Sequence, residues 1–117
     1  MKKLFISCPM AGISDEDIQR ERVHIQQETE EITGEKFEVI DSFVDGRTFS
    51  EKNAPVQYLG QSLMLLAEAD VVAFGKGWQR ARGCRIEHQV CIEYDIDAID
   101  VVVDRPPPAP LPETNSD

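Results

Sequence analysis

Four short apolar runs alternate with segments of helical pattern along this chain, and this alternation limits the folds open to it. The runs are residues 3–7 (KLFIS), 36–41 (KFEVID), 70–74 (DVVAF) and 98–103 (AIDVVV). Parallel strands that are covered on both faces read as nearly continuous apolar runs, and helical crossovers connect them. We therefore predict an α/β fold of three layers, in which helices flank a parallel sheet of about four to five strands.

The first helix has clear start and stop signals. Ser14 is a suitable N-cap, Asp17 completes a capping-box pattern, and Gly34 marks the end of a helix that runs to about residue 32. The segment is strongly polar, so we expect one side to touch the core and the rest to be solvated. Its narrow apolar stripe consists of Ile18, Ile25 and Ile32.

The next two helices are marked by apolar faces. Pro55 suits the first turn of the second helix, and the third is expected to run from about Arg82 to Tyr94. Ile92 falls on the outer face of the third helix, where exposure would suggest a subunit contact. The broad face of the second helix consists of Leu59, Leu63, Leu66 and Ala67, and the inward stripe of the third consists of Cys84, Glu87, Val90, Cys91 and Tyr94.

Length and charge exclude several classes of function. A chain of 117 residues is long enough for one domain, which we place at residues 1–103. Residues 104–117 are rich in proline and are expected to form an extended or disordered tail. A formal net charge of -10 argues against partners that require a basic footprint, namely nucleic acid and anionic membrane. No signal-peptide core or membrane-spanning run is seen, so we expect a cytoplasmic protein.

No cofactor or metal motif stands out. The three cysteines, Cys8, Cys84 and Cys91, fit no metal-ligand spacing and are expected to be reduced, buried thiols. Neither GxGxxG nor GxxxxGK[ST] occurs, so the dinucleotide and P-loop fingerprints are absent. We therefore expect no bound cofactor.

Ligands of parallel sheets bind beyond the carboxyl ends of the strands, and three loops should meet at that edge. They are residues 8–13, 42–53 and 75–82. The third loop belongs to a basic run, Lys76–Arg85, that holds no acid. It leads into a helix N-terminus, where free N–H groups and the fork of Arg82 could bind a phosphate or carboxylate. Alternatively, these arginines only balance acids on the surface.

Glu87 is the candidate with the most chemistry. A carboxylate on a half-buried helix face is seldom found unless it is paired or used. We place it in the first turn of its helix, where the dipole would keep it ionised and able to attack an acetal-like carbon. The alternative is a structural glutamate that caps the helix or pairs with Arg82 or Arg85.

Other polar and aromatic residues near these loops have two interpretations each. Trp78 could stack on a base or could cap an edge of the core. Asp41 could bind a sugar hydroxyl or could simply end its strand. His88 could be a general base, but it neighbours Glu87 and should be turned away from it, so we expect a surface histidine.

Three segments of the chain together resemble a known family. They are LFISCPMAG, SLMLLAEADVVAF and GWQRARGCRIEHQVCIEYDI. They are similar to small bacterial and phage proteins of the nucleoside 2-deoxyribosyltransferase-like type, catalogued as domain of unknown function family 4406. The resemblance covers roughly residues 2–103. It implies a flavodoxin-like, Rossmann-like sheet and enzymes that break or exchange the bond between a base and its sugar.

The resemblance also implies roles for individual residues. Glu87 would attack the anomeric carbon and form a glycosyl-enzyme. The sugar- and phosphate-side loop would be made of Ser7, Cys8, Pro9, Met10 and Gly12, and the phosphate-holding basic loop would include Gly77, Trp78, Arg82 and Gly83. Related enzymes carry a Tyr at Phe5 and acids at the positions of Ser62 and Ala81, so this chain lacks a hydroxyl and two supporting carboxylates.

Two functions of different classes follow. One is an N-glycosidic hydrolase or deoxyribosyltransferase-like enzyme that acts on a nucleotide or nucleoside, with Glu87 as its nucleophile. The other is a non-catalytic nucleotide-binding protein that sequesters or senses its ligand, as some phage-encoded proteins do. Members of the family form homo-oligomers, so we expect a dimer or a larger assembly.

Overall fold

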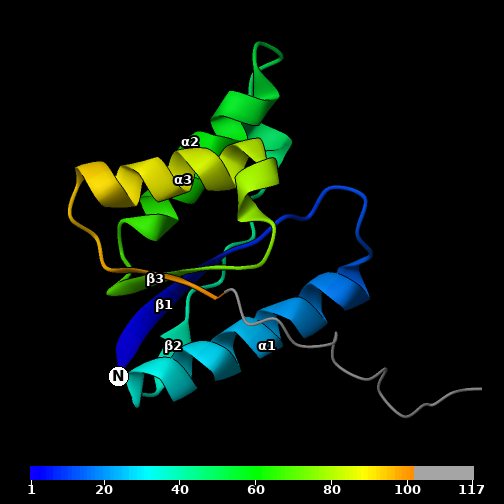
Figure 1. Cartoon of the computed structure of the whole chain (residues 1–117). Coiled ribbons are helices and arrows are strands. Elements are labelled where there is room, and N and C mark those ends of the chain that lie inside the picture. Colours follow the sequence, from blue (N-terminus) through cyan, green and yellow to red (C-terminus); the bar gives the residue numbers. More distant parts are fainter. Residues whose placement is uncertain (102–117) are drawn as a thin grey trace, which may run out of the picture.

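A four-stranded parallel sheet lies between helices in the computed structural model, which describes residues 1–101 (Figure 1). The predicted three-layer α/β fold, of flavodoxin-like type, is confirmed. The elements are β1 (Lys2–Ser7), α1 (Asp15–Thr33), β2 (Phe37–Val39), η1 (Gly46–Thr48), α2 (Ala54–Leu66), β3 (Val71–Phe74), η2 (Trp78–Arg80), α3 (Arg82–Glu93) and β4 (Ala98–Asp100). The second and fourth strands are shorter than expected. The predicted tail lies outside the described residues.

The strand order is β2-β1-β3-β4, so β1 lies inside the sheet. Leu4 pairs with Val39 of β2 and with Val71 of β3. The connection through α1 leads from β1 to one side of the sheet, whereas the connection through α2 leads back to the other side. Figure 1 shows α1 on one face of the sheet and α2 and α3 on the opposite face. This reversal of winding beside β1 opens a crevice at the carboxyl edge.

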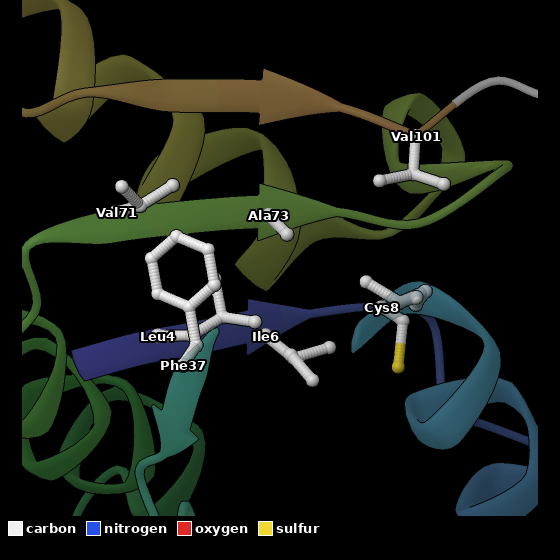
Figure 2. Close-up of a cluster of buried hydrophobic side chains, with 8 residues drawn as sticks. Leu4, Ile6, Cys8, Phe37, Val71, Ala73 and Val101 are labelled. Atoms are coloured by element: carbon white, nitrogen blue, oxygen red, sulfur yellow. The ribbon is translucent and has the colours of Figure 1, made fainter. Parts of the chain in front are cut away.

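Alternation along the strands divides the core into two clusters. Successive strand side chains point to opposite faces, so Leu4 and Ile6 face α1 whereas Phe5 faces α2 and α3. Figure 2 shows the cluster on the α1 side, which consists of Leu4, Ile6, Cys8, Ile25, Phe37, Val71, Ala73 and Val101. The second cluster consists of Phe5, Leu66, Val72, Phe74 and Cys91.

The ends of α1 are as predicted. The Ser14 hydroxyl accepts a hydrogen bond from the backbone N–H of Asp17 at 3.2 Å. Gly34 ends the helix in the left-handed conformation with φ 73°, a conformation that glycine adopts without steric cost. None of the helices in residues 1–101 is long and apolar enough to cross a membrane.

The predicted apolar stripe of α1 is correct for its first two residues and wrong for the last. Ile25 is fully buried, Ile18 is half-buried, and Ile32 is 55% exposed. A spacing of seven drifts by about 20° per repeat on a straight helix, so the stripe rotates away from the sheet by the last turn. Glu28 and Thr29 complete the buried face, and the Thr29 hydroxyl donates to the carbonyl of Ile25 at 2.7 Å.

Two isoleucines of α1 provide a test of this burial. We expect Ile25→Ala to lower the free energy of unfolding by about 2–5 kcal/mol, because it leaves a cavity against the sheet. Ile32→Ala should change the same quantity by less than about 0.5 kcal/mol, since its side chain is mostly in water. Urea unfolding of both variants makes the comparison. Similar losses for both would show that the C-terminal turn of α1 is packed against the protein.

Candidate functional site

The carboxylate of Glu87 is buried between two serine hydroxyls. Ser7 at the end of β1 donates a hydrogen bond to Glu87 Oε1 at 2.6 Å, and Ser62 of α2 donates to Oε2, also at 2.6 Å. The glutamate is 6% exposed and Ser7 is 3% exposed. Hydrogen bonds of this length to an ionised acceptor are strong, and they fix both oxygens. The carboxylate is therefore held in one orientation by side chains from three different elements.

The pattern of each element explains why these groups meet. Ser7 follows Phe5 by two residues, so it points to the same face of the sheet, toward α3. Cys84, Glu87 and Cys91 recur at helical spacing and are buried, which confirms the predicted inward stripe over these positions. Tyr94 was wrongly included in that stripe, because α3 ends at Glu93 and the tyrosine is 75% exposed. Its helical periodicity stops with the helix.

The position of Glu87 within its helix also differs from the prediction. The helix begins at Arg82, so Glu87 is its sixth residue and lies in the second turn, not the first. The helix dipole acts mainly within the first turn, so it contributes little at Glu87, and the carboxylate is contacted by the two serine hydroxyls instead. Neither Arg82 nor Arg85 pairs with Glu87 within residues 1–101, so the structural alternative of a salt bridge is not what the structure shows.

An open cavity of about 1370 Å³ lies at the carboxyl edge of the sheet, and Glu87 forms part of its wall. It extends from α1 on one face of the sheet to α2 and α3 on the other. All three predicted loops contribute to its lining. The predicted site residues that line it are Ser7, Cys8, Pro9, Met10, Asp41, Arg82, Gly83 and Glu87.

Three other predicted site residues do not line this cavity. Gly12 forms a turn before α1, with φ 75°. Gly77 has φ 84° and carries the turn into η2, where the side chain of Arg80 folds over it. Trp78 stacks on His88 with ring centroids 3.9 Å apart and 9° between the planes, and it also contacts Phe74. Of the two interpretations of Trp78, the structure shows the one in which it caps an edge of the core.

The stack on Trp78 corrects the expectation that His88 is a surface residue. The His88 side chain is only 21% exposed, and its Nε2 lies 3.2 Å from Asp100 Oδ1 at the end of β4. It also packs edge-on against Phe74. The histidine therefore joins the basic loop to the sheet, on the side of α3 that faces away from Glu87.

The cavity collects basic groups from an acidic chain. Arg22, Arg80 and Arg82 all line it. The N-cap residue of α3, Ala81, makes no side-chain capping bond, so the first turn of the helix presents N–H groups beside Arg82. Arg85 instead donates to the carbonyl of Gln79 at 3.0 Å and supports the loop. This end of the cavity is suited to an anion.

Two features of the site were missed in the sequence. Ser62 was considered only as a position that lacks a carboxylate, yet its hydroxyl holds Glu87. Arg22 lies on α1, whose polar faces were predicted to be exposed to solvent. The available signal was a polar stripe on α1 that recurs every three or four residues and faces the cavity: Asp15, Gln19, Arg22 and Gln26.

The three cysteines are free and buried, as predicted, and burial controls their acidity. Burial raises the pKa of Cys8 to about 11, although the nearby charge of Arg22 opposes the shift. Burial and then the charge of Glu87 raise the pKa of Cys91 to about 11. All three thiols are therefore protonated at neutral pH. Within residues 1–101, no three or more His, Cys, Asp or Glu side chains are grouped to hold a metal ion.

Comparison with known proteins places the chain in a family. Residues 2–100 match the family model described as a domain of unknown function (DUF4406). The chain belongs to this family. No curated protein and no solved structure matches it. The family description names no activity, so the geometry of the site is the basis for a function.

The two serines should differ in what they contribute to stability. Ser7→Ala should lower the free energy of unfolding by about 1–3 kcal/mol, because it leaves Glu87 Oε1 without its buried donor. Ser62→Ala should cost less, since this bond is only partly buried and water from the cavity can replace the hydroxyl. Urea unfolding of both variants tests the order. A larger loss for Ser62→Ala would contradict it.

The buried thiols predict a loss of stability at alkaline pH. Thiols of the unfolded chain ionise near the ordinary pKa of 9.0, whereas those of Cys8 and Cys91 keep their protons to about 11. The unfolded state therefore binds fewer protons above pH 9, and the free energy of unfolding should fall from about pH 9 to about pH 11. In Cys91→Ala this fall should be smaller, as measured by urea unfolding at about pH 8 and about pH 10.5. An equal fall in both proteins would contradict the assignment.

Proposed function

We propose that this protein cleaves or exchanges the N-glycosidic bond of a nucleotide or nucleoside, with Glu87 as the nucleophile. The observation that carries the proposal is the pair of hydroxyls that hold a buried carboxylate in the wall of a large cavity. A glutamate placed only for stability has no need to line a cavity at the carboxyl edge of a parallel sheet, where ligands of this fold class bind. The similarity of three sequence segments to nucleoside 2-deoxyribosyltransferase-like proteins supports the same role.

The chemistry requires two displacements at the anomeric carbon. One oxygen of Glu87 attacks this carbon, the C–N bond breaks, and its electron pair leaves with the base, which takes a proton from solvent. Water then attacks the same carbon, gives up a proton, and releases the sugar from the carboxylate. The sum is nucleoside plus water to base plus sugar. A second base in place of water would give transfer instead.

The basic end of the cavity supplies the binding energy for a phosphate. Arg80 and Arg82 line it, and the uncapped first turn of α3 presents N–H groups there. Because the chain carries a net charge of -10, a phosphate approaching elsewhere would be repelled. The local positive potential would direct the ligand to this edge, with its sugar toward Glu87.

A second candidate function is nucleotide binding without cleavage. The described lining of the cavity contains two carboxylates besides Glu87, those of Asp15 and Asp41. Both are exposed, and Asp41 already accepts a hydrogen bond from the backbone N–H of Phe43. Neither is buried beside Glu87 as a general acid of this site would be, and Ser62 and Ala81 replace the acids of related enzymes. This observation favours a protein that retains a nucleotide intact.

Glu87→Gln separates the two functions. The amide can accept from one serine and turn its NH₂ toward the oxygen of the other, so we expect the fold to persist. Under the first function the release of free base should fall by more than about 10³-fold, because an amide is no nucleophile. Chromatography of wild type and variant with nucleoside monophosphates, deoxynucleosides and NAD-derived nucleotides measures both released base and retained ligand.

The outcomes are distinct. Base release by the wild type that is lost in Glu87→Gln supports the enzyme. Ligand that is retained intact by both proteins supports the binding function and rejects the enzyme. Base release that continues in Glu87→Gln would show that another group is the nucleophile.

A further inference from the structure

Arg22 lies on the opposite side of the cavity from the basic loop. It belongs to α1, which covers one face of the sheet, whereas Arg80 and Arg82 belong to η2 and α3 on the other face (Figure 1). Both groups line the same cavity, which passes around the carboxyl ends of β1 and β2. The cavity therefore has two basic regions, and Glu87 lies on the α3 side.

The guanidinium of Arg22 has unused hydrogen-bonding capacity. Its Nη2 donates to the carbonyl of Ile40 at 3.5 Å, which is at the outer limit for a hydrogen bond. Within residues 1–101 no carboxylate lies within ion-pair distance of it. A guanidinium carries five N–H donors in a rigid fork, so most of them are left to solvent or to a ligand.

The surroundings of Arg22 are polar and half-buried. Gln19 and Gln26, one turn away on either side, also line the cavity. Gln26 is already engaged with Glu30 and with the carbonyl of Phe37, whereas the exposed Gln19 points along the same stripe of α1. The charge of Arg22 also reaches Cys8, whose pKa it lowers against the effect of burial.

The size of the cavity agrees with two binding positions. Pockets that enclose a drug-sized ligand measure about 300–1,000 Å³. At about 1370 Å³, this one has room for more than the ribose and phosphate that Glu87 and the basic loop would engage.

We infer that Arg22 forms a second anion-binding position, so that the ligand of this cavity carries two separated anionic groups. One is the phosphate at Arg80 and Arg82, and the other is a second phosphate or a carboxylate at Arg22. The inference rests on the proposed function for the identity of the ligand as a nucleotide. It extends that function by excluding simple nucleosides and nucleoside monophosphates as the preferred ligands.

Calorimetric binding to the full chain carrying Glu87→Gln tests the inference without turnover. Two pairs of probes differ by one anionic group: AMP with adenosine 3′,5′-bisphosphate, and UMP with orotidine 5′-monophosphate. We expect at least one member that carries the second anionic group to bind about 10- to 100-fold more tightly than its partner. Adding Arg22→Gln should remove that advantage and leave the affinity of the monophosphate unchanged. The pair that responds identifies the second group as phosphate or carboxylate.

Matched variants guard against general effects of charge or folding. Arg20→Gln removes the same charge from the same helix, but Arg20 does not line the cavity, so the advantage should persist. Arg22→Lys keeps the charge without the fork and should retain part of it. Arg82→Gln should weaken both members of a pair equally.

Two results would overturn the inference. One is equal affinity within both pairs; the other is an advantage that survives Arg22→Gln. Either leaves the proposed function intact if wild type still releases base in a Glu87-dependent manner. If no base is released but the second anionic group gives an advantage that depends on Arg22, the inference stands and the proposed enzyme is rejected. Failure of every probe to bind would reject both.

Discussion

The burial of one carboxylate constrains this structure more than any other single feature. An ionised group that is removed from water is strongly destabilising unless it is paired or hydrogen-bonded. Glu87 meets this requirement with two hydroxyls at 2.6 Å, one from β1 and one from α2. Because the glutamate itself belongs to α3, a shift of any of the three elements would leave a buried oxygen without its donor. The same bonds that stabilise the charge therefore fix the geometry of the cavity wall.

The distribution of charge follows a related logic. The chain carries a formal charge of -10, yet the cavity has three arginines in its lining against two exposed aspartates and the buried glutamate. The basic loop is kept in place by contacts that do not involve a ligand. Trp78 stacks on His88, His88 contacts Asp100, and Arg85 binds the carbonyl of Gln79. Within residues 1–101, no hydrogen bond or ion pair engages the guanidinium of Arg82, whereas the side chain of Arg80 folds over Gly77.

Local patterns predicted the framework, and tertiary contacts decided the rest. Strand alternation and cap residues such as Ser14 and Gly34 act within a few positions, so the sheet, the helices and the edge at which the cavity opens could be predicted from the sequence. The burial of Glu87 followed from helical spacing. Its partners could not be predicted, because Ser7 and Ser62 are 80 and 25 residues distant and meet it only in the folded chain. Arg22 was missed for the same reason, since a polar helix face gives no sign of whether it meets water or a cavity.

Under the proposed function, Ser62 and Ala81 stand where the resembled enzymes would carry acids, and this difference would change the chemistry of the site. An aspartate at position 62 would lie beside Glu87, and two carboxylates in contact cannot both be ionised easily, so one would keep a proton that it could give to a leaving base. A serine donates a hydrogen bond and leaves Glu87 as the only ionisable group of that contact. The site thus has a carboxylate that is fixed by two hydroxyls and no acid beside it. A base that departs from such a site must leave with negative charge or take its proton from water. Under the proposed function, a leaving group whose charge is delocalised is the kind that this arrangement would release.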